Sequence, residues 1–147
     1  MTLSQKSLYG LRAVFEIARR QGDGVATISE IAGAQSIPKR FLEGILNQLR
    51  GGGYLDSRRG KHGGYRLAKP AQAITVGEII RLLEGPLVLV DCVNQKDAGC
   101  PYAKTHCVFL PVWRRVQDAM ARTLDDTTIQ DLLDDEKRGT EALSFNI

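Results

Sequence analysis

Apolar residues recur at helical spacing along most of the chain, which predicts a mainly α-helical protein. The first such stretch runs from Leu3 to Arg20 and predicts one amphipathic helix. The pattern Thr27-Ile28-Ser29-Glu30 is a capping box, which satisfies free N–H groups at a helix start, so it predicts a second helix through about Ala34. A turn at 35–37 leads to a third helix, roughly 38 to 50, with Pro38 in its first turn. Two short helices joined by a tight turn are a helix-turn-helix.

The third predicted helix has an apolar face and a polar face. The apolar face is expected to be buried and contains Ile37, Phe41, Leu42, Ile45, Leu46 and Leu49. The polar face carries Lys39, Arg40, Glu43, Asn47 and Arg50. Arginine pairs well with guanine, asparagine with adenine and glutamate with cytosine, so this face suits a major groove. A solvent-exposed helix without a ligand has the same pattern, and this helix alone leaves both interpretations open.

A basic, glycine-rich turn follows this helix without a linker. Gly51-Gly52-Gly53 ends the helix, and residues 54–58 and 64–68 predict two short strands. The turn between them holds Arg58, Arg59 and Lys61 among glycines. Glycine permits the positive φ values of a tight hairpin, and the arginines can contact phosphates or enter a narrow minor groove. This order of elements predicts a winged helix-turn-helix that binds double-stranded DNA.

The second half of the chain predicts further helices. Thr75-Val76-Gly77-Glu78 is another capping box and opens a helix that ends at Gly85-Pro86. A loop at 86–107 precedes a helix from Pro111 to about Leu124, and a last helix starts at Thr127 or Thr128. The helix near 111–124 has one apolar stripe, which could pair with a second copy or pack back on the first helix: Val112, Trp113, Val116, Met120 and Leu124. The predicted fold is mainly α with a small two-stranded wing, divided into a DNA-binding domain at 1–70 and a dimerisation and sensing region at 71–147.

Charge and composition support a DNA partner and exclude other classes. The net charge of +3 conceals +7 in residues 1–70 and −4 in residues 71–147, so the basic half is the half with the wing. A solvated basic face is the alternative on charge alone. The sequence has no membrane-length apolar run and no signal-peptide pattern at its start, which predicts a cytoplasmic protein without a membrane partner. No CxxC, nucleophile set or phosphate loop is present, so an enzyme is not expected.

The three cysteines of the chain, Cys92, Cys100 and Cys107, all lie in the 86–107 loop at C-x7-C-x6-C spacing. Structural zinc sites usually contain closer cysteine pairs, whereas iron–sulfur clusters accept more varied loops. A metal centre, a redox-sensing thiol and cysteines without a role all remain open. A metal centre would need a fourth ligand, for which His106, a carboxylate or a residue of a partner subunit are candidates.

Several segments together resemble the Rrf2 family of winged-helix transcriptional regulators, the group containing IscR, NsrR and CymR. The resemblance covers nearly the whole chain and rests on the segments Leu3-Ser4-Gln5-Lys6-Ser7-Leu8-Tyr9-Gly10-Leu11-Arg12, Phe41-Leu42-Glu43, Leu49-Arg50, Arg59-Gly60, Gly63-Gly64-Tyr65, Ile74-Thr75-Val76-Gly77-Glu78-Ile79 and Leu83-Glu84-Gly85-Pro86. It implies a homodimeric repressor or activator, paired through the helix near 111–124, that binds a palindromic operator. It also implies that Glu43 reads the major groove, that Arg59 enters the minor groove, and that the three cysteines hold a [2Fe-2S] or [4Fe-4S] cluster.

Two differences from the family pattern concern this cluster. The cysteine spacing is longer than in cluster-binding members, and the positions of their known fourth ligands hold Leu110 and Leu8 here, which leaves His106 as the local candidate. The segment 83–86 and the end of the chain resemble the CymR branch instead. That resemblance implies a cluster-free regulator of cysteine and sulfur metabolism, controlled by an enzyme of cysteine synthesis or a metabolite.

Overall fold

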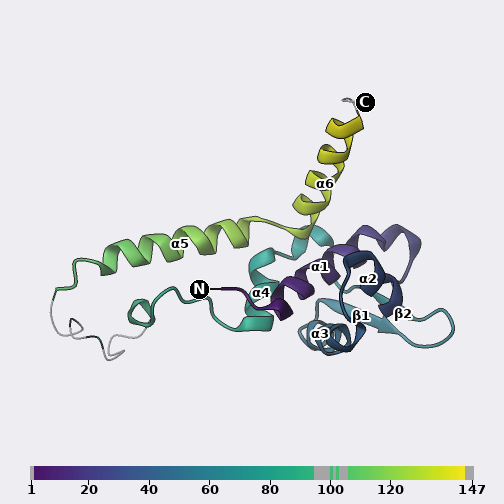
Figure 1. Cartoon of the computed structure of the whole chain (residues 1–147), viewed down its shortest axis with the longest axis horizontal. Coiled ribbons are helices and arrows are strands. Elements are labelled where there is room, and N and C mark those ends of the chain that lie inside the picture. The colour runs from purple at the N-terminus through teal and green to yellow at the C-terminus, as the bar shows by residue number, and fades with distance from the viewer. Residues whose placement is uncertain (1, 95–99, 101, 103–105, 145–147) are drawn as a thin grey trace.

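The computed structural model describes residues 2–94, 100, 102 and 106–144. Its helices and strands are α1 (Gln5–Arg19), η1 (Gln21–Asp23), α2 (Ile28–Gln35), α3 (Lys39–Gly51), β1 (Leu55–Arg58), β2 (Gly64–Leu67), η2 (Ala71–Ala73), α4 (Val76–Glu84), η3 (Asp91–Val93), α5 (Leu110–Asp126) and α6 (Ile129–Ser144). Helices α1 to α4 and the hairpin form one body, α5 extends from it to one side, and α6 projects in another direction (Figure 1). The mainly helical fold with a two-stranded wing is therefore confirmed.

Local sequence signals start the helices as predicted. The two capping boxes at Thr27 and Thr75 are both present, each with its hydroxyl accepting from the backbone of the glutamate three residues later. A third, unpredicted box starts α6, where Thr128 N–H donates to Asp131 at 2.8 Å and Asp131 N–H donates back to the Thr128 hydroxyl at 3.1 Å. The placement of Pro38 was wrong by one residue: it is the N-cap of α3 and lies before its first turn.

One core joins the helix-turn-helix to the second half of the chain. Helix α1 lies at its centre and packs against α2, α3, α4, α6 and β2. The core continues past residue 70, because Ile74, Ile79, Leu83 and Ile129 are buried in the same cluster as the residues of α1 and α3. Packing is therefore continuous across the predicted division at residue 70, and different roles for the two parts stay a prediction.

Two large apolar side chains of α1 and α3 lie partly outside the core. Phe41 is 50% exposed and Leu8 is 37% exposed. Phe41 lies at the edge of the apolar stripe of α3, where it lines a shallow apolar groove with Tyr9, Ile45 and the first residues of α1. The expectation that all six apolar residues of this helix are buried was wrong for Phe41.

Helix α5 is anchored at its C-terminal end. Val76 N–H donates to the Thr127 carbonyl and Ile129 N–H to the Ile74 carbonyl, both at 2.9 Å. Arg81 pairs with Asp125, whose carboxylate lies over Gly77, where a Cβ would be only 2.1 Å away. Helix α5 packs mainly against α4 and η3, and does not fold back along α1.

Candidate nucleic-acid interface and cysteine loop

Helix α3 presents its predicted polar face to solvent. Leu42, Ile45, Leu46 and Leu49 are buried on the opposite side and fix the rotation of the helix. The five polar side chains of this face, Lys39, Arg40, Glu43, Asn47 and Arg50, are all exposed. The turn before α3 is short because Ser36 adopts the left-handed conformation, with φ of 52°. Helix α3 is therefore held firmly by its apolar face and is open on its polar face.

The wing is a regular hairpin whose tip depends on glycine. Leu55 pairs with Leu67 and Arg58 with Gly64, so the tip comprises residues 59–63. Gly60 has φ of +108°, and its carbonyl accepts from Gly63 N–H at 2.9 Å to close the turn. A Cβ at Gly64 would lie 2.6 Å from the Ala26 carbonyl oxygen, so only glycine allows the wing to approach the segment before α2 this closely.

Hydrogen bonds join the wing to both helices of the helix-turn-helix. Ala26 and Tyr65 exchange two backbone hydrogen bonds of 2.8 Å, which ties β2 to the start of α2. Arg50 donates through Nη1 to the Ser57 hydroxyl at 3.0 Å, which ties the end of α3 to β1. These hydrogen bonds connect the wing to both α2 and α3. No pattern in the sequence predicted the contribution of Ser57.

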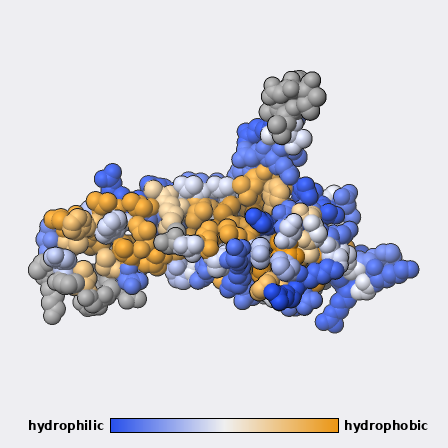
Figure 2. Space-filling view, in the orientation of Figure 1, coloured by the Kyte–Doolittle hydropathy of each residue, from blue (hydrophilic) through white to orange (hydrophobic). Residues whose placement is uncertain are grey.

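Three cations at the tip of the wing have no carboxylate partner among the described residues. In the part of the chain that the structure describes, Arg58, Arg59 and Lys61 have no carboxylate within 4.0 Å, and Arg66 pairs with Asp56 at 3.5 Å. The Arg40 guanidinium lies 4.8 Å from the centroid of the Phe41 ring. Figure 2 shows hydrophilic residues over the wing end of the molecule. Unpaired guanidinium and ammonium groups on one exposed face attract phosphates.

The cysteine loop is described only in part. Cys92 lies in η3, and Cys92, Cys100 and Cys107 are free thiols of intermediate burial, whereas His106 is exposed. Among the described residues, no three His, Cys, Asp or Glu side chains come together as metal ligands. The remaining loop positions, 95–99, 101 and 103–105, lie outside the described residues.

One side chain of α5 holds the start of this loop. Gln117 accepts from Leu89 N–H at 3.3 Å and donates to the Asn94 side chain at 3.3 Å. Asn94 caps η3, the short helix that carries Cys92. The contact of Gln117 with this loop was not predicted, because an isolated glutamine on a helix resembles any other exposed polar residue.

The predicted apolar stripe of α5 is half-buried along one edge and exposed along the other. Trp113, Met120 and Leu124 are half-buried. Val112 and Val116 are 48% and 45% exposed and continue a patch that includes Val108 and Phe109. This patch, called here the α5 stripe (Val108, Phe109, Val112 and Val116), belongs to the hydrophobic area that Figure 2 shows along α5. A groove of about 400 Å³ runs beside it, lined by Val112, Arg115, Val116, Ala119 and Arg122.

The helix-turn-helix, its exposed polar face and the basic wing define a winged-helix DNA-binding transcriptional regulator. No helix among the described residues is long and apolar enough to cross a membrane. A family model described as "Iron-dependent Transcriptional regulator" matches residues 3–135, and the chain belongs to this family, Rrf2. The predicted family is thereby confirmed.

Known relatives agree with this assignment. The chain is 35% identical to the HTH-type transcriptional regulator CymR of Bacillus subtilis over 147 residues, which covers all of both chains. The structure of CymR, named the global cysteine regulator of B. subtilis, matches with a TM-score of 0.74 and 36% identity, over 90% of this chain and 95% of that one. IscR of T. potens matches with a TM-score of 0.77 and 32% identity, over 95% and 90% of the two chains. These relatives are regulators, which confirms the prediction that the chain is not an enzyme.

Proposed function

We propose that the protein is a homodimeric regulator that inserts α3 into a major groove and the wing tip into the adjacent minor groove. The observation that carries this proposal is the single exposed, cationic surface formed by α3 and the wing and joined by the Arg50–Ser57 hydrogen bond. In this arrangement Arg40, Glu43 and Asn47 face base edges, while Lys39, Arg50, Arg58 and Lys61 contact phosphates. Arg59, at the tip, enters the minor groove.

A second copy is the proposed occupant of the α5 stripe. The stripe is apolar and exposed, and α5 extends away from the body that carries the reading surface (Figure 1). Two α5 helices paired on a two-fold axis would place the two reading surfaces on successive half-sites of a palindromic operator. DNA binding also places the protein in the cytoplasm within this proposal.

Substitution of Arg59 by alanine tests the DNA-binding surface. The probe is a duplex selected from a random-sequence library by the wild-type protein. Arg59→Ala should weaken binding about tenfold and reduce the slope of log affinity against log salt by about 0.9, the value for one phosphate charge that is no longer neutralised by a bound cation. The control is Arg138→Ala, which removes the same charge from α6, where Arg138 pairs with Asp135. Equal affinity and slope for the two variants would refute the proposed role of the wing.

We further propose that iron–sulfur or redox status regulates DNA binding through the cysteine loop. Thiolates are the ligands that iron–sulfur clusters require, and a bound cluster would supply a redox-active centre held by Cys92, Cys100 and Cys107, with His106 as the candidate fourth ligand. The described residues do not gather these groups into a metal site. Anaerobic purification and a visible spectrum test this cofactor: a colourless protein that takes up neither iron nor sulfide on reconstitution would reject it.

A second candidate is a cluster-free regulator of the CymR type. The observation that favours it is similarity to CymR from end to end. A structure named the oxidised form of CymR from Staphylococcus aureus also matches, with 34% identity and a TM-score of 0.69 over 90% of this chain and 95% of that one. Control would then pass through thiol oxidation, a metabolite or an enzyme of cysteine synthesis as partner. Oxidation of a cluster-free sample that changes its affinity for DNA would support this candidate, and removal of all three cysteines should abolish the change.

A further inference from the structure

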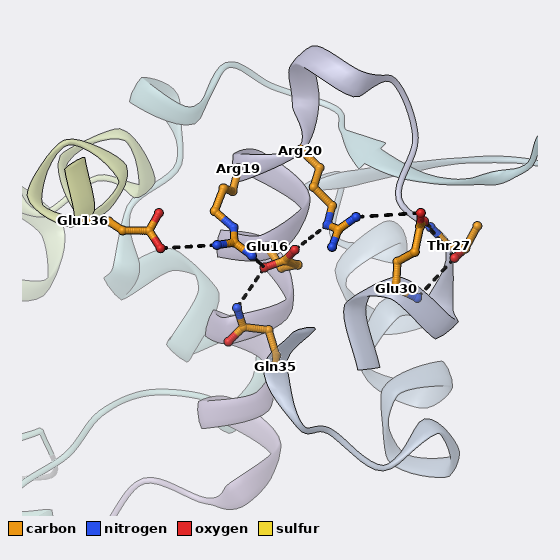
Figure 3. A network of polar contacts seen from close by, with 7 residues as sticks. All are labelled: Glu16, Arg19, Arg20, Thr27, Glu30, Gln35 and Glu136. Atoms are coloured by element: carbon orange, nitrogen blue, oxygen red, sulfur yellow. Dashed lines mark hydrogen bonds and ion pairs between the residues drawn. The ribbon is translucent and has the colours of Figure 1, made fainter. Parts of the chain in front are cut away.

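A buried carboxylate in α1 connects three helices. Glu16 is fully buried, and three donors surround its two oxygens (Figure 3). Arg20 Nε donates to one oxygen, and Arg19 Nη2 and Gln35 Nε2 donate to the other at 2.6 Å and 2.9 Å. Burial raises the pKa of Glu16, but the hydrogen bonds from Arg20 and Gln35 and the nearby Arg19 outweigh it, so the pKa lies below its ordinary value. The carboxylate is therefore ionised and fully partnered.

This carboxylate is connected to both ends of α2, the first helix of the helix-turn-helix, directly through Gln35 and indirectly through Arg20. Gln35 is the last residue of α2 and binds Glu16 directly. At the other end, Arg20 lies 3.8 Å from the carboxylate of Glu30, which also forms the capping box with Thr27. The position of α2 relative to α1 is thus fixed at two points, and α3 follows α2 after a short turn (Figure 3).

The same carboxylate is also connected to the C-terminal helix α6, through Arg19. Arg19, bound to Glu16 through Nη2, donates through Nη1 to Glu136 of α6 at 3.5 Å. The apolar packing of α6 is concentrated at its beginning, where Ile129 is buried and Leu132 and Leu133 are partly buried. Glu136 is one turn further along, where α6 begins to leave the body, so its ion pair is a contact that a movement of α6 would break early.

We propose that Glu16 is a positioning residue that couples α6 to the DNA-reading helices α2 and α3. A buried ion pair seldom stabilises a fold more than apolar packing does, and its best-attested use is to fix one arrangement of neighbouring elements. When α6 is in place, Glu136 holds Arg19 in the position where it binds Glu16. When α6 moves, Arg19 is freed on one side, and the restraint on α2 weakens. This proposal rests on DNA reading by α3.

The test compares two charge-removing variants of α6 in the full-length protein. Glu136→Gln breaks the link to Arg19. Asp134→Asn removes the same charge from a carboxylate whose one hydrogen bond among the described residues lies within α6, from Gln130. Exposed ion pairs contribute little free energy, so Glu136→Gln should bind the selected duplex only about two- to fivefold more weakly than Asp134→Asn. For the same reason the two variants should have similar melting temperatures. Equal affinities for the two variants would overturn the coupling.

A double-mutant cycle tests the route through Glu16. In a Glu16→Gln background, Glu136→Gln should change DNA affinity no further; a full additional effect would show that α6 acts by another route and would overturn the proposal. Gln35→Met, which keeps length but removes the donor to Glu16, provides the same cycle if Glu16→Gln does not fold. Arg59→Ala distinguishes a failure of the coupling from a failure of the DNA-reading surface. If Arg59→Ala weakens DNA binding while the two α6 variants bind equally, only the coupling is refuted. If it does not, the proposed DNA-reading surface fails first.

Discussion

Replacement of two exposed valines of α5 by aspartate is expected to separate the dimer. Val112 and Val116 are each about half exposed in a single chain, at 48% and 45%. Full burial of a valine side chain contributes about 1.5 kcal/mol, so covering the exposed half contributes about 0.7 kcal/mol. Four such side chains meet in a symmetric dimer, which gives about 3 kcal/mol, or a dissociation constant raised about a hundredfold. Burial of the new carboxylates adds to this cost.

Sedimentation equilibrium over a wide concentration range measures this dissociation. The wild type should be a dimer, and Val112→Asp with Val116→Asp should approach the 16.2 kDa monomer mass. Arg114→Asp is the control, because it changes the net charge by the same amount at an exposed position on the other side of α5. Circular dichroism should show the same helix content in both variants, since aspartate near the beginning of α5 suits the helix dipole. A wild-type monomer at micromolar concentration, or a dimer equally stable in both variants, would refute the assignment of the α5 stripe.

The features that the sequence predicted well are those set by a few neighbouring residues. The capping boxes at Thr27 and Thr75 need only a hydroxyl and a carboxylate three positions apart, and both are present. The wing tip needs glycine at fixed positions in the turn, and Gly60 has the expected positive φ. The box at Thr128 was missed because aspartate replaces the usual glutamate of the pattern.

Features decided by tertiary packing were not predicted. Glu16 is a charged residue on an amphipathic helix, which normally indicates solvent, but α2 and α6 bring Gln35 and Glu136 to its network. Phe41 fits the apolar stripe of α3 by periodicity, yet no neighbouring element covers it fully. Periodicity gives the direction of a side chain from its own helix, and burial depends on what the rest of the chain places there.

The arrangement of the three cysteines was also not predictable from sequence patterns. The spacing of Cys92, Cys100 and Cys107 identifies a set of thiols, but ligand geometry depends on how the loop folds, for which neither periodicity nor capping provides a signal. What the structure adds is an attachment point, because Gln117 connects the beginning of this loop to α5. A change at Cys92 therefore has a short physical route to the helix proposed to set the distance between the reading surfaces.

Substitutions of Glu43, Gln117 and Glu16 test three other parts of the structure. Glu43→Ala should broaden base preference at one operator position, by about 1–3 kcal/mol of lost discrimination, with a smaller change in total affinity; an unaltered preference in a selection experiment would contradict this role. Gln117→Leu removes the acceptor for Leu89 N–H and should speed hydrogen exchange of that amide about fivefold, as loss of one hydrogen bond of about 1 kcal/mol implies; unchanged exchange would exclude the attachment. The pKa of Glu16 is lowered in the folded state, so below about pH 4.5 the unfolded state binds more protons than the folded state does. The stability that the ionised Glu16 contributes at higher pH is therefore lost as the pH falls through this range. Urea unfolding between about pH 5 and pH 3 should thus show a steeper loss of stability for the wild type than for Glu16→Gln, and parallel curves would mean that the Glu16 carboxylate is not held as an ion.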